Sequence, residues 1–274
     1  MVVDVARCNG CYNCVIACKD EHWENEWRPI AAAQPRHGAF WINLEKKERG
    51  QFPRVKVSYT PKLCMHCHDP PCSQPAEQNA VYTRPDGIVI IDPEKAVNQK
   101  ELLTACPYEA IFWNEEKRLP QKCTFCAHLL DGGWAEPRCV QACPTHALVF
   151  GDSDDPHSEV SKILATETVE VFQPQFNLKT NVYYVGLPKA FVGGTVVFGD
   201  TDECADGVKV TLECPSETKQ FTSRTNNYGD FEFENLLLRR KYRVRLEADG
   251  YAIASVDLQL EQDMYLGQIT LKRK

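Results

Sequence analysis

The pattern of hydrophobic and polar residues divides the chain into two parts. From about residue 189 onwards apolar and polar residues alternate with a period of two, as in GVKVTLEC (207–214) and KYRVRLEA (241–248). This alternation places every second side chain on the same face of a strand. The side chains expected to face one way are Val208, Val210, Leu212, Phe231, Phe233, Tyr242, Val244, Leu246, Val256, Leu258 and Leu260. Together with the turn-forming stretch TNNYGD (225–230), they predict an all-β, seven-stranded sandwich over residues 189–274.

The first 165 residues follow no such regular pattern. RVKVSYT (54–60) and GIVIID (87–92) predict short strands, and PEKAVNQKELLTAC (93–106) predicts a short helix. DSDDPHSEVSKILA (152–165) offers an Asp/Ser cap followed by a short amphipathic helix. Residues 166–188, which contain Pro174 and Pro188, are predicted to link a domain of residues 1–165 to the sandwich of residues 189–274.

Cysteines change the picture of the first part. Twelve of the fourteen lie between Cys8 and Cys143, and only Cys204 and Cys214 come later. The opening residues MVVDVAR resemble no export signal, and no stretch approaches the ~20 apolar residues of a membrane span. We therefore expect a cytoplasmic protein whose clustered cysteines bind metal rather than form disulfides, unless a partner chain carries an export signal for both. The formal charge of −7 and the absence of a basic stripe argue against a nucleic-acid partner.

The twelve cysteines fall into four segments that each close with the same three-residue gap. The segments are Cys8, Cys11, Cys14 and Cys18; Cys64, Cys67, Cys72 and Ala76; Ala96, Gln99, Leu102 and Cys106; and Cys123, Cys126, Cys139 and Cys143. The first and third have identical spacing, so the third reads as a copy that has lost three of four ligands.

Zinc is the main alternative to iron–sulfur clusters. Cys123, Cys126, Cys139 and Cys143 could form a four-thiolate zinc site. However, Cys8 to Cys18 places four thiolates within eleven residues, too tightly for one tetrahedral zinc. Cys106 and Cys143 are both followed by proline, as in bacterial ferredoxins. These features favour cubane clusters.

The ferredoxin rule predicts which cysteines share a cluster. In two-cluster ferredoxins three closely spaced cysteines hold one cube and the fourth reaches across to the other. Applied to the outer segments, the rule assigns Cys8, Cys11, Cys14 and Cys143 to cluster 1, and Cys123, Cys126, Cys139 and Cys18 to cluster 2. Applied to the inner segments, it assigns Cys64, Cys67, Cys72 and Cys106 to cluster 3.

A fourth cluster would need cysteines at Ala76, Ala96, Gln99 and Leu102. All four ligands of this site are absent, whereas all four ligands of its neighbour are present. The sequence therefore predicts three intact [4Fe–4S] clusters and the deletion of one complete site. His66 and His68 lie within the second segment and could act as Rieske-type ligands, but cluster 3 is complete without them.

No catalytic residue stands out: the chain contains no Ser/His/Asp order, phosphate loop or isolated carboxylate pair. Three cubes in one small domain would form a row of one-electron carriers. The cysteine domain is thus predicted to transfer electrons and to leave the chemistry to another chain.

The four-segment plan resembles the iron–sulfur subunits of molybdopterin oxidoreductases of the dimethyl sulfoxide reductase family. The resemblance covers about residues 1–165 and rests on CNGCYNCVIACKDE, CMHCHDPPC, ACPYEAIFW, KCTFCAHLLDGG, CVQACPTHALVFGD and DDPHSEVSKIL. It implies a duplicated bacterial-ferredoxin-like fold and a heterodimer with a large catalytic subunit. Molybdenum and molybdopterin guanine dinucleotide are expected only on that partner. Members of this family normally hold four cubanes, so this chain departs from the pattern.

The second part, from about residue 190, resembles transthyretin-like and carboxypeptidase-regulatory-like sandwiches through GVKVTLEC, TNNYGDFEFENL and YRVRLEADGY. The expected fold class of the whole chain is therefore α+β. Cys204 and Cys214 are expected to be thiols, or a disulfide in an oxidising compartment. A subunit of another molybdopterin reductase or dehydrogenase, a free polyferredoxin and a zinc-stabilised adaptor are the alternative functions.

Overall fold

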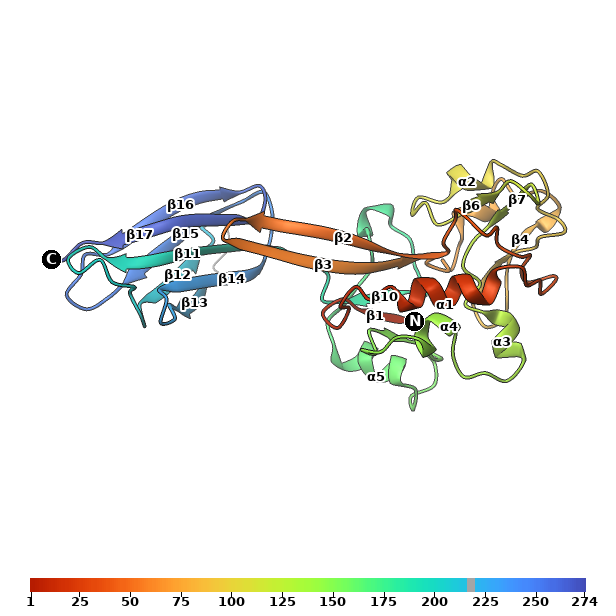
Figure 1. Cartoon of the computed structure of the whole chain (residues 1–274), viewed down its shortest axis with the longest axis horizontal. Helices are drawn as coiled ribbons and strands as arrows, with labels where there is room; N and C mark the ends of the chain where they lie inside the picture. The colour runs from red at the N-terminus through yellow and green to blue at the C-terminus, as the bar shows by residue number, and fades with distance from the viewer. Residues whose placement is uncertain (216–219) are drawn as a thin grey trace. The chain divides into compact units, whose positions relative to one another are not determined.

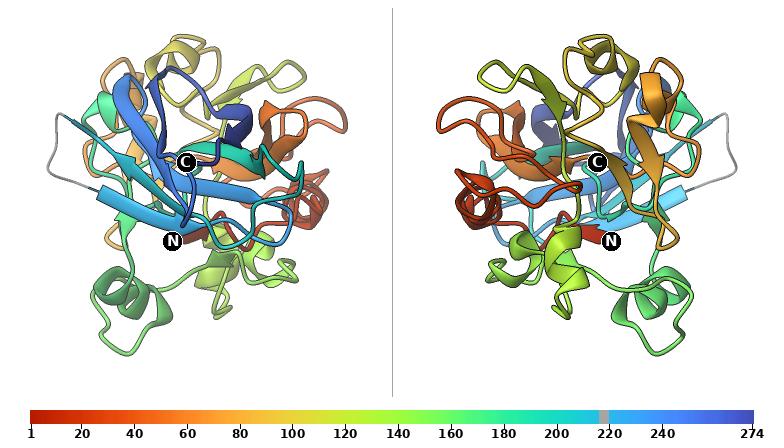
Figure 2. Two further views of the ribbon diagram at one scale, coloured as in Figure 1. Left: turned by 90° about the vertical axis from the view of Figure 1, so that its left-hand side faces the viewer. Right: turned by 90° about the vertical axis from the view of Figure 1, so that its right-hand side faces the viewer.

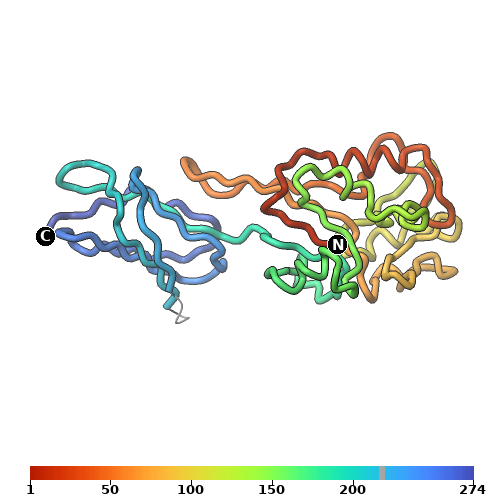
Figure 3. Tube along the Cα trace, turned by 90° about the horizontal axis from the view of Figure 1, so that it is seen from below, coloured from red at the N-terminus to blue at the C-terminus, as the bar shows by residue number. Residues whose placement is uncertain are grey.

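The computed structural model describes residues 1–215 and 220–274. The chain forms two compact units, Met1–Lys46 with Ser58–Leu187 and Lys47–Val57 with Pro188–Lys274. The chain therefore passes between the units at three places, once at Leu187–Pro188 and twice within one hairpin (Figure 3). No helix among the described residues is long and apolar enough to cross a membrane.

The elements of the first unit are mostly short. They are β1 (Val2–Asp4), α1 (Asn13–His22), β2 (Ile42–Gln51), β3 (Arg54–Leu63), η1 (Pro71–Ser73), η2 (Glu77–Asn79), β4 (Val81–Thr83), β5 (Val89–Ile91), α2 (Leu102–Ala105), β6 (Phe112–Asn114), β7 (Leu119–Gln121), α3 (Ala127–Asp131), α4 (Arg138–Gln141), β8 (Leu148–Val149), α5 (Glu159–Thr166), β9 (Val169–Glu170), η3 (Pro174–Phe176) and β10 (Tyr183–Val185). The ends of the β2–β3 hairpin belong to this unit and its tip, residues 47–57, belongs to the other.

A four-stranded sheet in the order β8-β1-β10-β9 joins the start of the first unit to its end. β10 runs parallel to β1 and pairs Tyr184 with Val3, and the side chains of both residues are fully buried. The Tyr184 hydroxyl also donates a hydrogen bond of 2.8 Å to the carbonyl of Pro61. The prediction of a linker over residues 166–188 is therefore wrong. Its apolar side chains pair and pack with the cysteine domain, and the unit extends to Leu187.

Two helix predictions had different outcomes. α5 begins as expected, because the Ser158 side chain caps it by accepting a hydrogen bond from the amide of Ser161 at 3.1 Å. The helix predicted over residues 93–106 is wrong over most of its length, since only Leu102–Ala105 is helical. Asn98 adopts a left-handed conformation with φ 64°, which interrupts a helix at that point.

Cysteines form part of the hydrophobic core of the first unit. The core includes Cys14, Cys18, Cys64, Cys67, Cys123 and Cys139 together with Trp41, Met65 and Tyr184. Helices α1 and α4, which carry cysteines of the first and fourth segments, lie side by side (Figure 1). Cysteines far apart in sequence are thereby brought to the same region.

The second unit contains β11 (Ala190–Phe198), β12 (Lys209–Glu213), β13 (Gln220–Arg224), β14 (Asp230–Leu236), β15 (Arg240–Glu247), β16 (Ala254–Leu260) and β17 (Met264–Leu271). Its described residues form a three-stranded sheet, β14-β11-β17, and a four-stranded sheet, β13-β12-β15-β16. Figure 2 shows these strands in teal and blue. Both sheets supply side chains to one core, including Val196 and Phe231 from the first and Leu212 and Leu246 from the second. Burying one Leu or Val side chain in this core stabilises the folded state by roughly 1.5–3 kcal/mol. Since the described elements of this unit are all strands, its predicted all-β character is confirmed.

The tip of the β2–β3 hairpin is held in the second unit by ion pairs. Arg49 Nη1 contacts the Asp263 carboxylate at 3.2 Å and donates to the Lys189 carbonyl at 2.7 Å. Asp263 also accepts a hydrogen bond from the Phe191 amide at 2.9 Å. Lys56 pairs with Glu232 and Glu234 of β14. The tip therefore closes against strands β11, β14 and β17 through charged side chains.

Candidate metal centres

The first C-x2-C loop of each of the first, second and fourth segments has the same local conformation. The residue before the second cysteine is left-handed in each loop, with φ 74° at Gly10, 44° at His66 and 50° at Phe125. This turn directs the backbone amide of that residue towards the sulfur of the first cysteine. The His66 amide lies 3.4 Å from Cys64 Sγ, and the Phe125 amide lies 3.4 Å from Cys123 Sγ.

Gly10 plays the same part in the first loop, where its amide bonds to the sulfur of Cys8. It is glycine for two reasons. Its φ is positive, and a Cβ at this position would lie 2.7 Å from the ring of Tyr59. Backbone amides aimed at sulfur stabilise a negatively charged thiolate, so these loops suit metal-bound cysteines.

Cys8, Cys11, Cys14 and Cys143 lie together in the first unit. Burial, followed by the negative charges of the other three thiolates, raises the pKa of Cys14 to about 12. Burial and the same neighbours also raise the pKa of Cys8. This group is the most accessible of the three, because Cys11 is exposed and Cys8 and Cys143 are half-buried. We call these four residues set 1.

A second group, set 2, consists of Cys18, Cys123, Cys126 and Cys139. All four side chains are buried. Burial raises the pKa of Cys18 and of Cys139 well above the ordinary value, and the charges of Cys123 and Cys126 add to both effects. Cys18 is thus brought from the first segment to the three cysteines of the fourth.

The third group, set 3, consists of Cys64, Cys67, Cys72 and Cys106. Burial, then the charges of Cys64, Cys106 and Cys72, raise the pKa of Cys67 to about 12. Cys106, which is remote in sequence, therefore lies with the cysteines of the second segment. Its neighbour Tyr108 is also affected, since burial and the charges of Cys67 and Cys106 raise the pKa of Tyr108 to about 12.

Set 2 is influenced electrostatically by both of the other sets. The charge of Cys14 in set 1 raises the pKa of Cys18 and Cys139 in set 2. The charge of Cys64 in set 3 raises the pKa of Cys123 in set 2. Set 2 therefore lies near both set 1 and set 3.

The donor sets suit a cationic group that binds four thiolates. Without such a group, burial and mutual repulsion hold these thiols in their protonated form, as the raised pKa values indicate. The iron ions of a cluster would bind the soft, deprotonated sulfurs and displace their protons. Among the described residues, no three His, Cys, Asp or Glu side chains are arranged to hold a single metal ion. A cubane differs from such a site because its four thiolates bind four different iron atoms.

The four positions at which the sequence predicts a lost cluster are packed within the protein. Ala96 and Leu102 are fully buried, and Ala76 packs against the same hydrophobic cluster. The Gln99 side chain accepts a hydrogen bond from the Glu77 amide at 3.0 Å and donates one to the Lys95 carbonyl at 2.9 Å. Apolar packing and a hydrogen-bonded amide thus occupy all four of these positions.

The backbone at this position nevertheless retains the conformation of a ligand loop. Ala96 and Gln99 are spaced like the two cysteines of a C-x2-C loop. Asn98, the residue before Gln99, has φ 64°, and Gly10, His66 and Phe125 have positive φ at the equivalent position of their loops. α2 follows this loop as α1 follows the first. The loop of residues 96–99 therefore has the backbone geometry of the other cysteine loops without their cysteine side chains, and Cys106 is the one cysteine of the third segment.

His66 is occupied by contacts with the protein. Its Nδ1 accepts a hydrogen bond from the Val89 amide at 3.0 Å, and its ring stacks on Phe125 at 3.7 Å between centroids. Burial lowers the pKa of His66 well below its ordinary value. His68 is exposed. These contacts favour the non-ligand interpretation of His66.

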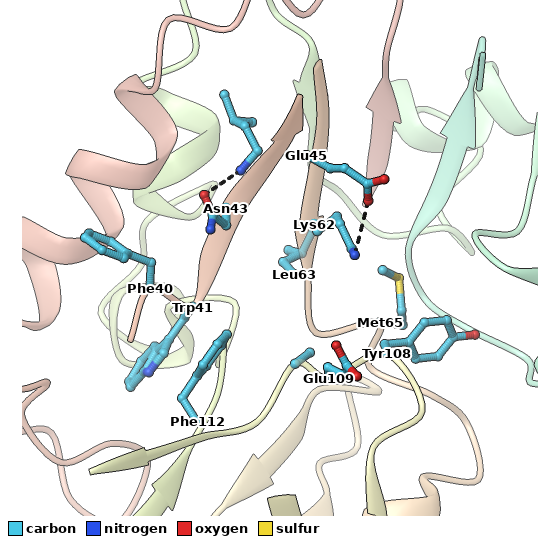
Figure 4. A pocket seen from close by; sticks show the side chains of 12 residues that line it. Phe40, Trp41, Asn43, Glu45, Lys62, Leu63, Met65, Tyr108, Glu109 and Phe112 are labelled. Carbon is cyan, nitrogen blue, oxygen red and sulfur yellow. Dashed lines mark hydrogen bonds and ion pairs between the residues drawn. The ribbon is translucent and has the colours of Figure 1, made fainter. Parts of the chain in front are cut away.

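A cavity of about 450 Å³ adjoins set 3 (Figure 4). Its walls are largely aromatic and aliphatic, and they include Met65 and Tyr108, which follow Cys64 and Cys106 closely in sequence. Glu45 and Lys62 form an ion pair of 3.2 Å in its lining.

The two cysteines outside the three sets and the tryptophans are the remaining candidates from the sequence. Cys204 is exposed and Cys214 is buried, both in the second unit, and no disulfide forms among the described cysteines. Of the tryptophans in the segment before the β2–β3 hairpin, Trp41 is buried and Trp27 stacks on His128 at 3.8 Å. No pattern in the sequence singled out the sulfur-bound amides or the buried Lys122, which precedes Cys123.

Comparisons with known proteins agree with this arrangement. Residues 55–153 match the model of the 4Fe-4S dicluster domain family. One subunit of the tetrathionate reductase of Salmonella typhimurium is 35% identical over 70% of this chain and 74% of its own length. One subunit of the sulfite dehydrogenase of Allochromatium vinosum is 33% identical over 68% of this chain and 81% of its own.

The chain therefore belongs to the family of iron–sulfur, electron-transfer subunits of molybdopterin oxidoreductases. Within this family it is similar over nearly its whole length to the pyrogallol hydroxytransferase small subunit of Pelobacter acidigallici. The two are 42% identical over 99% of this chain and 98% of the relative. The Klebsiella pneumoniae 5-hydroxyisourate hydrolase structure matches 31% of this chain with 20% identity, but its TM-score of 0.26 is too low to support an argument.

Proposed function

We propose that this chain carries three [4Fe–4S] clusters and forms the electron-transfer subunit of a pyrogallol–phloroglucinol hydroxytransferase. In this proposal a larger partner chain holds molybdenum on molybdopterin guanine dinucleotide and carries out the chemistry. When bound, each cluster supplies a one-electron carrier. Sets 1, 2 and 3 are the ligands of clusters 1, 2 and 3, and Ala76, Ala96, Gln99 and Leu102 mark a lost fourth site.

The grouping of the twelve cysteines is the observation that carries the cluster assignment. Each set combines three cysteines of one segment with one cysteine of another, as the ferredoxin exchange rule requires. The packed side chains at the fourth position support a count of three rather than four.

The residues around the cysteine sets donate hydrogen bonds to sulfur and control the access of water. Backbone amides donate to sulfur, as at Cys64 and Cys123, and Ala147 N lies 3.2 Å from Cys143 Sγ. The buried side chains around set 2 exclude water from the middle of the row, whereas set 1 is accessible through Cys11. This arrangement supports electron movement along the order 1–2–3 or its reverse.

The extent of similarity supports the choice of enzyme. The match to the pyrogallol hydroxytransferase small subunit includes the second unit, whereas the tetrathionate reductase and sulfite dehydrogenase relatives match about 70% of the chain or less. We include in the proposal a transthyretin-like or carboxypeptidase-regulatory-like fold for the second unit, with a docking role. A cytoplasmic location is also part of the proposal.

Purification under gentle, anaerobic conditions tests this proposal. We expect the chain to elute with a larger chain that contains molybdenum, and the complex to convert pyrogallol to phloroglucinol. A complex that reduces or oxidises another substrate, but not pyrogallol, would indicate another molybdopterin reductase or dehydrogenase. Elution alone near 31.1 kDa would contradict a bound subunit and favour a free polyferredoxin.

A further inference from the structure

The tip of the β2–β3 hairpin carries exposed apolar side chains. Phe52 and Pro53 form the turn of the hairpin, and Phe52 is 89% exposed, the highest value among the large hydrophobic residues that the structure describes. Val55 and Val57 of β3 follow, with exposed fractions of 54% and 47%. All of these residues belong to the second unit. We call Phe52, Val55 and Val57 the tip patch.

The distribution of side chains over β3 at the tip is the reverse of that in an ordinary surface strand. Successive side chains of a strand point to opposite faces, so Val55 and Val57 share one face and Arg54 and Lys56 share the other. Arg54 and Lys56 are half-buried and form ion pairs with carboxylates of β14. The strand therefore directs its charged side chains towards β14 and its apolar side chains towards solvent.

Contacts from both strands hold the inner face of the tip in place. The Lys56 ammonium lies over the ring of Phe191, 4.8 Å from the ring centroid, and Phe191 is fully buried. On β2, Arg49 pairs with the Asp263 carboxylate. A patch that is already fixed loses little conformational freedom when a partner binds it. An exposed aromatic residue on such a support is typical of an interface anchor.

The small size of the tip patch limits what can cover it. A buried Phe side chain contributes about 150–250 Å², and each valine contributes less. A stable interface takes about 800 Å² from each partner, well above what the tip patch offers. The patch is therefore too small to hold two chains together by itself, and its occupant must be a chain that is also bound elsewhere.

A second copy of this chain meets that requirement poorly. Each copy carries a formal charge of −7, so two copies repel each other. The chain belongs to a family of enzyme subunits, which are bound to a partner through surfaces of their own. The catalytic partner chain is thus the occupant that the size of the patch and the charge of the chain both favour.

We propose that the tip patch docks into an apolar pocket of the molybdenum-bearing partner chain, with Phe52 as the anchor. This inference rests on the proposed function, to which it adds the surface through which the second unit takes part in docking. Val55 and Val57 flank the anchor and exclude water from the contact. The removal of these three side chains from water supplies the driving force.

The test measures how fast the intact, anaerobically purified complex dissociates, by exchange against an excess of labelled wild-type chain. In the triple variant Phe52→Ser, Val55→Thr and Val57→Thr we expect Kd to rise about tenfold, mainly through faster dissociation. Threonine has the branched shape and strand preference of valine, so the hairpin should still form. Circular dichroism verifies the fold, and the iron content should not change.

Tyr228→Ser combined with Ile253→Thr is the matched control. Both residues lie in the second unit outside the hairpin, and they are 66% and 54% exposed. The control therefore removes exposed apolar surface from the same unit by the same kinds of substitution. It should leave the dissociation rate unchanged, and an effect equal to that of the triple variant would overturn the tip patch as a specific site.

An unchanged dissociation rate in a folded triple variant would also overturn the inference. The same holds for a dimer of the isolated chain that the triple variant abolishes, because a second copy would then cover the patch. If the triple variant does not fold, Phe52→Ser alone decides the question, since this side chain contacts mainly solvent: faster dissociation supports the inference and an unchanged rate contradicts it. Failure of the proposed function is recognised separately, since the wild-type chain would then purify without a molybdenum-containing partner.

Discussion

At the scale of single residues, Cys106 decides how the inner segments are interpreted. It is the one cysteine in a segment whose other ligand positions are Ala96, Gln99 and Leu102. The structure brings it to the three cysteines of the second segment, where its charge affects Cys67 and Cys72. It is thus a member of a complete set rather than an isolated thiol.

Replacing Cys106 with serine should disturb one cluster only. Because hydroxyl oxygen is a harder and poorer ligand for iron than thiolate, we expect the cluster at set 3 to be lost or altered. Iron content should fall from about twelve to about eight atoms per chain, since each cube holds four. Iron analysis and electron paramagnetic resonance of the variant measure both effects.

Cys204→Ser is the control, because Cys204 is exposed and lies in the second unit. It should retain all the iron of the wild type. Loss of the clusters at sets 1 and 2 before that at set 3 would show that Cys106 has been assigned to the wrong site.

At the scale of elements, the β2–β3 hairpin belongs to both units. Its tip contains Gly50, whose φ of 85° and contact with the Arg54 carbonyl leave no room for a Cβ. The tip presents Arg49 and Lys56 to the acidic residues Asp263, Glu232 and Glu234. The pair of Arg49 with Asp263 is the more buried contact, with side chains 12% and 10% exposed.

Arg49→Ala should therefore destabilise the second unit. Removing one partner leaves the Asp263 carboxylate buried and unpaired, which costs about 3–5 kcal/mol. Thermal unfolding followed by far-ultraviolet circular dichroism should show a lower midpoint for the β-rich unit. The visible absorbance of the clusters should be lost at the temperature seen in the wild type.

Arg243→Ala provides the comparison, since Arg243 pairs with Asp257 while both side chains are at least half exposed. This exposed pair is worth about 0–1 kcal/mol. Equal effects of the two substitutions would mean that the hairpin tip does not contribute specifically to the second unit.

The elements also explain which predictions from sequence succeeded. The strands of the second unit could be predicted because Val208, Val210 and Leu212 alternate with polar residues and one face is buried. The capped helix α5 could be predicted from Ser158. The helix at residues 93–106 could not, since its periodicity gives no sign of the left-handed conformation of Asn98.

The linker predicted over residues 166–188 was wrong because its sequence gave little sign of the short strand within it. Its prolines suggested an irregular segment, but Val182 and Tyr184 are fully buried against the cysteine domain, and strand β10 is only three residues long. So short a strand carries little periodic signal in the sequence.

The cysteine sets were predictable because their spacing repeats, whereas Lys122 and the amide donors depend on contacts between distant segments.

At the scale of the whole molecule, the two units have cores of different composition. Cysteines of all three sets are part of the core of the first unit. The core of the second unit consists mainly of aliphatic and aromatic side chains from its two sheets. The folding of the first unit should therefore depend on its clusters, and that of the second should not.

Removal of iron with a chelator under oxidising conditions tests this difference. We expect the first unit to lose its fixed structure and become sensitive to protease. A resistant fragment should contain strands β11–β17, with the hairpin tip of residues 47–57 retained on it. Simultaneous digestion of both units would contradict separate cores, and resistance of both would mean that the clusters do not support the fold of the first.

The number of clusters in one chain is the central claim, and native mass spectrometry of the anaerobically purified chain measures it most directly. The account predicts that the loaded chain exceeds the mass of the apo-chain by three [4Fe–4S] clusters. It also predicts that Cys106→Ser exceeds its own apo-mass by two. A wild-type chain with four clusters would mean that other ligands restore the site at Ala76, Ala96, Gln99 and Leu102, and one with two would mean that Cys106 binds no cluster.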